Sequence, residues 1–303
     1  MNQEYYENLI NSIDKQRVLL GEPMSRHTTF RIGGPADYFI MPADIAEVKR
    51  AIDLCIEYDI PYYILGNGSN LLVGDKGYRG AMIQIYKEMS RITVNGDEIT
   101  AQAGALLSKI AAKAYEEKLT GLEFASGIPG TVGGAVTMNA GAYGREMKDV
   151  IVSVTVLTGN DEILTLNKEE LKLGYRTSII AKNDYIVIET VLQLRPGDQS
   201  GIKAYLNELR EQRTSKQPLD YPSAGSTFKR PEGYFAGKLI QDAGLKGFQV
   251  GGAQVSEKHS GFVINKGEAT ARDVVELMEQ VIEKVYEQFG VTLEPEVKRL
   301  GEF

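Results

Sequence analysis

Residues 126–144, SGIPGTVGGAVTMNAGAYG, have a composition that suits the binding of an anionic ligand. The segment contains neither a lysine nor the Gly-Lys-Ser/Thr ending of a P-loop. Glycine lets backbone N–H groups approach a ligand closely, and Thr131, Thr137 and Asn139 add neutral donors. The segment therefore predicts a diphosphate held by amide dipoles, with tight turns and close packing as the structural alternative. Its central glycines are Gly127, Gly130, Gly133 and Gly134.

A second glycine-rich segment, LGNGSNL (65–71), follows a short apolar run and at first suggests a dinucleotide fingerprint. That pattern fails, because Leu71 occupies the third glycine position and the next residues favour strand and turn over helix. A Rossmann loop needs a helix N-terminus there to receive the diphosphate. We therefore expect a non-Rossmann loop that shares an anion-binding role with residues 126–144, with a plain turn as the alternative.

Three further segments contain residue types that serve in other proteins as proton donors or as ligands of anions. Arg176 lies between a short helix and a strand, and Ser226 lies in the flexible segment AGSTFK. The surroundings of Ser226 are not the Gly-x-Ser-x-Gly elbow of a serine hydrolase. Glu294 and Glu296 share one face of a predicted strand, where they are either an acid and a base or a solvated edge. Taken alone, each segment also fits an ordinary surface charge or turn.

Composition excludes several classes of function. The 303 residues include 34 Lys and Arg against 41 Asp and Glu, and the net charge of −7 disfavours a nucleic-acid partner. The only cysteine is Cys55 and the only histidines are His27 and His259, which excludes an intrachain disulfide and a Cys/His zinc site. The first residues lack a signal-peptide pattern and no apolar run reaches 18 residues, so we expect a cytoplasmic protein.

The elements that must position these segments alternate helices and strands. Residues 38–65 suggest strand, helix and strand, because apolar residues from Ile45 to Cys55 recur at helical spacing after a cap at Asp44. Such a βαβ-like unit favours parallel pairing of its strands. A second helix is predicted over 106–118 among several strands, an order typical of an α+β fold. The predicted strands lie at 81–85, 92–104, 150–158, 162–166 and 185–194.

The pattern changes after residues 195–201, RPGDQSG, which have the composition of a linker. A helix is predicted over 202–213. The last helix begins at Thr270, where Asp273 completes a capping box, and ends at Gly290. Its apolar stripe is Val274, Met278, Val281, Ile282 and Val285, and a strand is predicted to follow over 291–300.

Together these segments resemble the UDP-N-acetylenolpyruvoylglucosamine reductase (MurB) family. The similar segments follow the family's order over nearly the whole chain, and the ordered set is far more specific than any single member. They are HTTFRIGGPADYF (27–39), LGNGSNLL (65–72), SGIPGTVGGAVTMNAGAYG (126–144), YRTS (175–178), AGSTFKRP (224–231), AGKLIQDAGLKG (236–247) and LEPEVKRLG (293–301).

The resemblance implies an α+β protein with two subdomains that clasp FAD in the fold of vanillyl-alcohol-oxidase (PCMH-type) flavoproteins. It places the first subdomain at 1–75, with residues 296–303 returning to it, the second at 76–198, and a substrate-binding domain at 199–303. It also implies noncovalent FAD, NADPH as co-substrate and no metal. The implied FAD contacts are Leu65, Gly66, Asn67, Gly68, Ser69, Asn70 and Leu71 in one segment, and Ser126, Gly127, Ile128, Pro129, Gly130, Thr131, Gly133, Gly134, Ala135, Asn139, Gly141, Ala142 and Tyr143 in the other.

The implied reaction reduces the enolpyruvyl group of UDP-N-acetylglucosamine enolpyruvate, a step of peptidoglycan precursor synthesis. The family's catalytic arginine falls on Arg176, its proton-donating serine on Ser226 and its catalytic glutamate on Glu296. Hydride from flavin N5 would reach the methylene carbon, Arg176 and Glu296 would stabilise the enolate, and Ser226 would protonate the adjacent carbon. Tyr175, Lys216, Lys229 and Arg230 are the expected substrate contacts, with Arg213 as an alternate cation for the sugar-nucleotide diphosphate.

Two features depart from the family's longer subtype. Only AKND joins Ile180 to the next strand, which leaves no room for that subtype's substrate-capping tyrosine, and Arg230 stands where asparagine is usual. The chain therefore resembles the shorter subtype. The alternatives are a flavin-dependent alcohol or sugar-lactone oxidase of the same fold and a nucleotide-sugar binding protein without catalysis. The sequence gives no oligomeric state, and a monomer is the default expectation.

Overall fold

The computed structural model describes residues 2–303, which form two compact units. Unit 1 contains the chain up to Leu19, Phe39–Asn67 and Met82–Arg213. Unit 2 contains Leu20–Tyr38, Gly68–Ala81 and Thr214–Phe303. Each unit therefore draws on several separate stretches of the chain, whereas the division at residues 75 and 198 is contiguous in sequence and remains a prediction.

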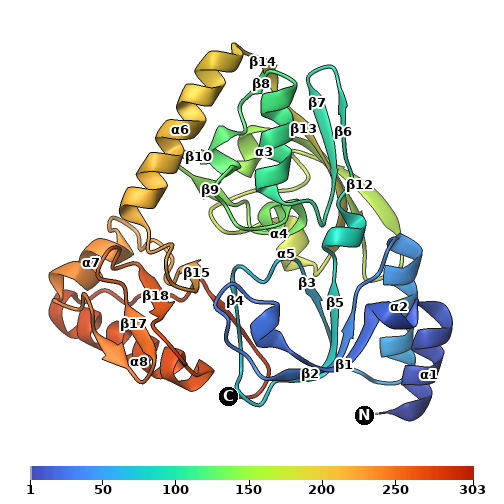
Figure 1. Ribbon diagram of the computed structural model, residues 1–303, viewed down its shortest axis with the longest axis horizontal. Coiled ribbons are helices and arrows are strands. Elements are labelled where there is room, and N and C mark those ends of the chain that lie inside the picture. The colour runs from blue at the N-terminus through green and yellow to red at the C-terminus, as the bar shows by residue number, and fades with distance from the viewer. Residues whose placement is uncertain (1) are drawn as a thin grey trace. The chain divides into compact units, whose positions relative to one another are not determined.

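Unit 1 is built on a five-stranded antiparallel sheet of order β12-β11-β13-β7-β6. The short helix α4 (Val132–Thr137) packs against β13 and β7 (Figure 1). Val154 and Val156 of β11 are buried, as expected for alternate residues on the covered face of a half-buried strand. The five strands are β6 (Ile92–Asn95), β7 (Glu98–Gln102), β11 (Ile151–Leu157), β12 (Ile163–Asn167) and β13 (Ile186–Gln193).

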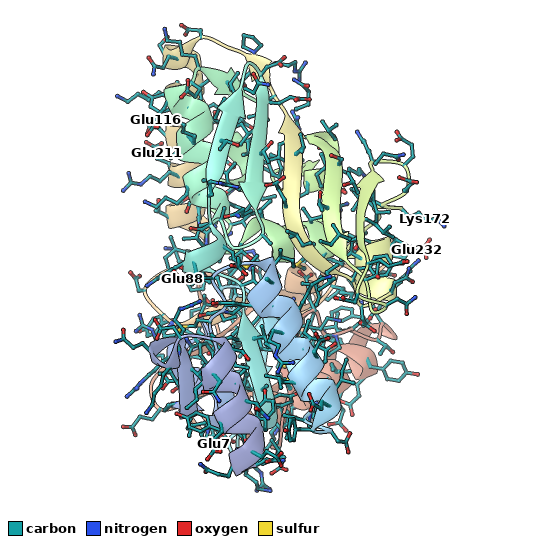
Figure 2. The ribbon with its side chains drawn as sticks, turned by 90° about the vertical axis from the view of Figure 1, so that its right-hand side faces the viewer. Glu7, Glu88, Glu116, Lys172, Glu211 and Glu232 are labelled. Atoms are coloured by element: carbon teal, nitrogen blue, oxygen red, sulfur yellow. The ribbon has the colours of Figure 1, made fainter. Side chains whose placement is uncertain are left out.

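Two helices near the N-terminus of the chain, α1 (Gln3–Ser12) and α2 (Ile45–Glu57), pack side by side in unit 1 (Figure 2). The buried Tyr5 hydroxyl lies 3.2 Å from the Cys55 sulfur, and burial raises the pKa of the Cys55 thiol to about 11. The predicted cap of α2 is confirmed, because the Asp44 side chain accepts a hydrogen bond from Glu47 N over 2.9 Å.

The strands on either side of α2 do not pair directly. They are β2 (Pro35–Ile40) and β3 (Tyr62–Leu65), and they belong to a sheet of order β1-β2-β5-β3. The strand β5 (Tyr78–Gln84) lies between them, so the predicted direct pairing is wrong. A helical crossover fixes that two strands share a sheet, but it leaves room for a later strand to enter between them.

Unit 2 contains a four-stranded antiparallel sheet of order β15-β18-β17-β16 and the long helix α8 (Ala271–Phe289). The capping box of Thr270 and Asp273 and the left-handed C-cap at Gly290 are both confirmed. The predicted stripe of α8 is buried except for Ile282, which is only partly buried. The sheet consists of β15 (Ser223–Ser226), β16 (Gln249–Val250), β17 (Ala253–Val255) and β18 (Phe262–Asn265).

The C-terminal residues are less regular than predicted. In place of one strand over 291–300, residues 298–300 form β19 (Lys298–Leu300), which pairs in parallel with β4 (Leu71–Val73). Pro295, which has no N–H group to donate, forms only an isolated bridge with Phe228. The helix predicted over 202–213 is longer, running from Gln199 to Lys216 (α6) because Asp198 caps it.

The remaining elements are short. They are β1 (Val18–Pro23), α3 (Leu107–Glu116), β8 (Leu119–Thr120), β9 (Gly141–Ala142), β10 (Arg145–Glu146), α5 (Ile179–Lys182), β14 (Arg195–Pro196) and α7 (Ala236–Asp242). Across residues 2–303, no helix combines the length and the apolar character that crossing a bilayer requires.

Candidate active site

The helix α4 begins within the glycine-rich segment 126–144, directly after the loop 126–131, and the amides of Gly133 and Gly134 are already occupied. Gly133 N donates to Ala103 O over 2.9 Å, and a Cβ at Gly133 would lie 3.0 Å from Ala103 Cβ. Gly134 N donates over 3.5 Å to the hydroxyl of Thr131, which caps the helix. Close packing and capping, the structural alternative, therefore account for these two glycines.

The loop before α4 contains amides that no protein group occupies. Gly127, Gly130 and Thr131 donate no backbone hydrogen bond to an acceptor in the described part of the chain, residues 2–303. Neutral backbone N–H groups without a protein partner are the donors that commonly bind a diphosphate. Unpartnered donors in a loop of this composition fit the predicted anion site.

The end of β3 lies against this loop, so the structure brings part of the two glycine segments together. Asn67 Nδ2 donates to Pro129 O over 2.5 Å. A Cβ at Gly66 would lie only 2.5 Å from Thr131 Oγ1, so residue 66 must be glycine for this approach. The contact joins two segments more than 60 residues apart in the sequence, as a shared site requires.

The rest of the glycine-rich segment 65–71, from Gly68 to Leu71, belongs to unit 2. Gly68 has φ +61, and a Cβ there would lie 2.0 Å from the His27 carbonyl oxygen. Asn70 Nδ2 donates to Glu296 O over 3.1 Å. Leu71 begins β4. Glycine at residue 68 is thus required by local packing, and the Asn70 side chain supports the backbone of Glu296.

Arg213, near the end of α6, lies over the glycine loop within unit 1. A Cβ at Gly127 would lie 2.9 Å from Arg213 Nη1 and 3.0 Å from its Cδ, so the arginine side chain packs directly against this glycine. Burial lowers the pKa of Arg213, and within residues 2–303 its guanidinium makes no hydrogen bond or ion pair. A partly buried charge without a counter-charge is costly, and an anionic ligand would offset that cost.

Arg176 lies at the third position of a tight turn in unit 1. Gly174 N donates to Thr177 O over 3.0 Å, and Thr177 N donates back to Gly174 O over 3.3 Å. Arg176 itself has φ 55, in the left-handed region that residues other than glycine seldom adopt. The Arg176 guanidinium carbon lies 5.0 Å from the centre of the Tyr175 ring. A strained backbone is common where a side chain must point in a fixed direction.

Ser226 and Glu296 belong to unit 2, where backbone pairing places their chain segments next to each other. Glu296 N donates to Thr227 O over 2.8 Å, and Lys229 N donates to Glu294 O over 2.8 Å. Thr227 Oγ1 also accepts a hydrogen bond from Val263 N. Thr227, the residue after Ser226, is therefore hydrogen-bonded to Glu296 through the backbone. The structure thus brings the chain segments of two of the three predicted catalytic residues together.

The two carboxylates of the C-terminal segment have different surroundings. The Glu294 side chain is 69% exposed and forms an ion pair with Lys229. Glu296 is only 9% exposed. Pro295, between them, forms an antiparallel bridge with Phe228, so the local pairing keeps the predicted alternation, and the two side chains differ in exposure. Glu294 is a solvated surface charge, and Glu296 is the buried carboxylate of the two.

The other predicted substrate residues differ in how available they are. Lys229 is paired with Glu294. The guanidinium carbon of Arg230 lies 4.0 Å from the centre of the exposed Phe235 ring. Lys216 is exposed at the end of α6. Lys216 and Arg230 thus stay predicted contacts of the diphosphate, whereas Lys229 is held by a carboxylate.

Two further features bear on cofactors. Tyr143, a predicted FAD contact, donates through its hydroxyl to Leu209 O of α6 over 3.2 Å. A Cβ at Gly141 would lie 2.6 Å from Arg145 O, so this glycine is required by the pairing of β9 and β10. Among the residues that the structure describes, no group of three or more His, Cys, Asp or Glu could hold a metal ion.

Comparison with known families gives two matches that together cover most of the chain. Residues 36–167 match the FAD binding domain. Residues 217–300 match the UDP-N-acetylenolpyruvoylglucosamine reductase C-terminal domain. Both glycine-rich segments, residues 65–71 and 126–144, lie within the first match, and Arg213 lies outside it.

Several complete proteins are similar to this chain over all or nearly all of its length. A UDP-N-acetylenolpyruvoylglucosamine reductase from Agathobacter rectalis is 56% identical over 100% of both chains. One from Alkaliphilus oremlandii is 55% identical over 98% of each. The crystal structure of the Thermus caldophilus enzyme superposes with a TM-score of 0.80 at 35% identity, covering 93% of this chain and 98% of that one. Fold and sequence thus point to the same group of proteins.

Proposed function

The chain belongs to the UDP-N-acetylenolpyruvoylglucosamine reductase family, and on this premise we propose how its own residues carry out the family's reaction. It is an FAD-dependent oxidoreductase, a UDP-N-acetylmuramate dehydrogenase of peptidoglycan precursor synthesis that uses NADPH. The observation that carries this assignment is 56% identity over the full length of a family member. The roles of individual residues below are our proposal.

The residues around the glycine loop fit the diphosphate of a noncovalent FAD. The unpartnered amides of Gly127, Gly130 and Thr131 would donate to its oxygens, and Arg213 would supply the positive charge. Bound FAD supplies the hydride chemistry, while the protein orients substrate and stabilises charge. The loop contains no histidine or cysteine for a covalent link to the flavin.

Three residues would act on the enolpyruvyl group. Arg176 presents a planar, permanently charged fork suited to the substrate carboxylate. A protonated Glu296 would donate a hydrogen bond to the same carboxylate as negative charge develops there. Ser226 would deliver a proton to the adjacent carbon, because hydride addition leaves that carbon strongly basic. Tyr175, Lys216 and Arg230 would contact the rest of the substrate, with Lys229 held by Glu294.

The finer assignments are also proposals. The short connection after Ile180, which consists of the last two residues of α5 (Ile179–Lys182) and a turn, supports the shorter subtype without a capping tyrosine. We expect a monomeric enzyme in the cytoplasm.

An anaerobic absorbance experiment tests the proposed function. The purified protein should be yellow, bleach on addition of NADPH, and regain its colour when UDP-N-acetylglucosamine enolpyruvate is added. Recovery of colour only on admission of oxygen would instead favour a flavin oxidase. Colour that stays with the denatured polypeptide would contradict noncovalent FAD.

Arg213 gives a separate prediction about cofactor binding. Arg213→Gln should weaken FAD binding to the apoprotein by about 10- to 100-fold, because a charge-assisted hydrogen bond contributes about 1.5–3 kcal/mol. Titration of flavin fluorescence measures this affinity. Arg210→Gln is a matched control, since Arg210 lies on the same helix but is exposed. Weaker UDP binding to the holoenzyme with unchanged FAD affinity would assign Arg213 to the sugar nucleotide.

A further inference from the structure

The turn that carries Arg176 is tied at both ends to the glycine-rich segment. At the first end, Asn139 Nδ2 donates to Gly174 O over 3.0 Å. At the other end, Ser178 Oγ donates to Thr137 O over 2.6 Å. Residues 137–139 therefore hold the two ends of a turn that begins 35 positions further along the chain.

The Asn139 side chain is committed to this role. It is 1% exposed, and its Nδ2 also donates to Glu146 Oε2 over 2.5 Å. Its Oδ1 accepts a hydrogen bond from Lys148 N over 2.9 Å. Both amide hydrogens are thus used inside the protein. Asn139 was expected to contact FAD, but it has no donor left to offer a ligand.

The Arg176 turn needs such support because its backbone is strained. A residue other than glycine in the left-handed region costs about 1–2 kcal/mol, and Arg176 has φ 55. Strained residues persist only where their surroundings hold them in place. Ser178 contributes a second constraint, since it is fully buried and its Oγ also caps α5 through Ala181 N.

We propose that Asn139 and Ser178 are positioning residues that fix the direction of the Arg176 guanidinium. This inference rests on the proposed function, in which Arg176 binds the substrate carboxylate. The glycine-rich segment would then have two roles: its first half binds the cofactor diphosphate, and its last residues hold the turn of the catalytic arginine. Cofactor loop and arginine are thereby linked through two side-chain hydrogen bonds.

A double-mutant cycle in stopped flow tests the proposal. Asn139→Ala should slow reoxidation of the reduced enzyme by the enolpyruvyl substrate about 10- to 100-fold, because a displacement of about 1 Å can cost 10²-fold. Reduction by NADPH and the affinity for FAD should change by less than about 3-fold. Asn139→Ala in an Arg176→Ala background should cause no further loss, since the residue acts through Arg176.

The outcomes separate the two hypotheses. If the losses of Asn139→Ala and Arg176→Ala multiply, Asn139 does not act through Arg176 and the positioning role is wrong. If Arg176→Ala alone leaves reoxidation unchanged, the proposed role of Arg176 fails instead. Thr190→Val is the matched control, because Thr190 is buried in the same unit and its Oγ1 has no partner within residues 2–303. Should Asn139→Ala fail to fold, Ser178→Ala tests the other end of the turn with the same cycle.

Discussion

Ser226→Ala is expected to block the second half-reaction and spare the first. NADPH should still bleach the flavin at the rate of the parent enzyme, because that step requires no proton at the substrate carbon. Reoxidation by UDP-N-acetylglucosamine enolpyruvate should slow by about 10²–10⁴-fold, the usual loss when a positioned acid is removed. Stopped-flow absorbance of the flavin measures the two steps separately.

Local geometry makes this substitution a clean test. Ser226 ends β15, and the pairing of this strand with β18 and with the segment around Glu296 is made by backbone groups and Thr227. Alanine preserves those hydrogen bonds. Ser223→Ala, on the same strand, is the matched control, because the Ser223 group that accepts from Thr29 is its carbonyl oxygen. Steady-state turnover close to that of the parent enzyme in Ser226→Ala would refute the assignment of Ser226 as the acid.

Local sequence patterns predicted the features that depend only on residues close together in the chain. The capping box at Thr270 and the helix stop at Gly290 depend on residues within one turn of the helix, and the structure confirms both. Pairing of strands around α2 was predicted wrongly, because the intervening strand β5 comes from later in the chain. Position in a sheet depends on contacts distant in sequence, which periodicity does not record.

In the candidate site, too, local features were predictable and contacts between distant residues were not. Glycine density singled out both glycine-rich segments, but it did not distinguish an open amide at Gly127 from an occupied one at Gly133. That distinction depends on Ala103, which lies 30 residues away. The partners of the Asn139 side chain were not predictable for the same reason, since Gly174 and Lys148 come next to it only after folding. A buried polar residue forms the hydrogen bonds available in the fold, and sequence alone does not show those partners.

Glu296 and Glu294 provide the second large prediction, because one segment contains a buried carboxylate and an exposed one. Glu296→Ala should slow reoxidation by the enolpyruvyl substrate about 10²–10³-fold, the typical cost of removing one donor to a developing oxyanion. Glu294→Ala should change it by less than about 3-fold, because its carboxylate is exposed and bonded only to Lys229. Flavin reduction by NADPH should be unaffected in both variants.

A third substitution at residue 296 distinguishes two ways in which the glutamate could act. If Glu296 contributes a hydrogen-bond donor to the substrate carboxylate, Glu296→Gln keeps an N–H group there and should lose less activity than Glu296→Ala. If Glu296 instead resupplies the proton that Ser226 delivers, glutamine cannot replace it and the two variants should be equally slow. Equal losses in both half-reactions would point to a structural role, because Glu296 N holds Thr227 next to Ser226. We expect the first result, because Glu296 is only 9% exposed and burial favours the neutral form of a carboxyl, which can donate a hydrogen bond.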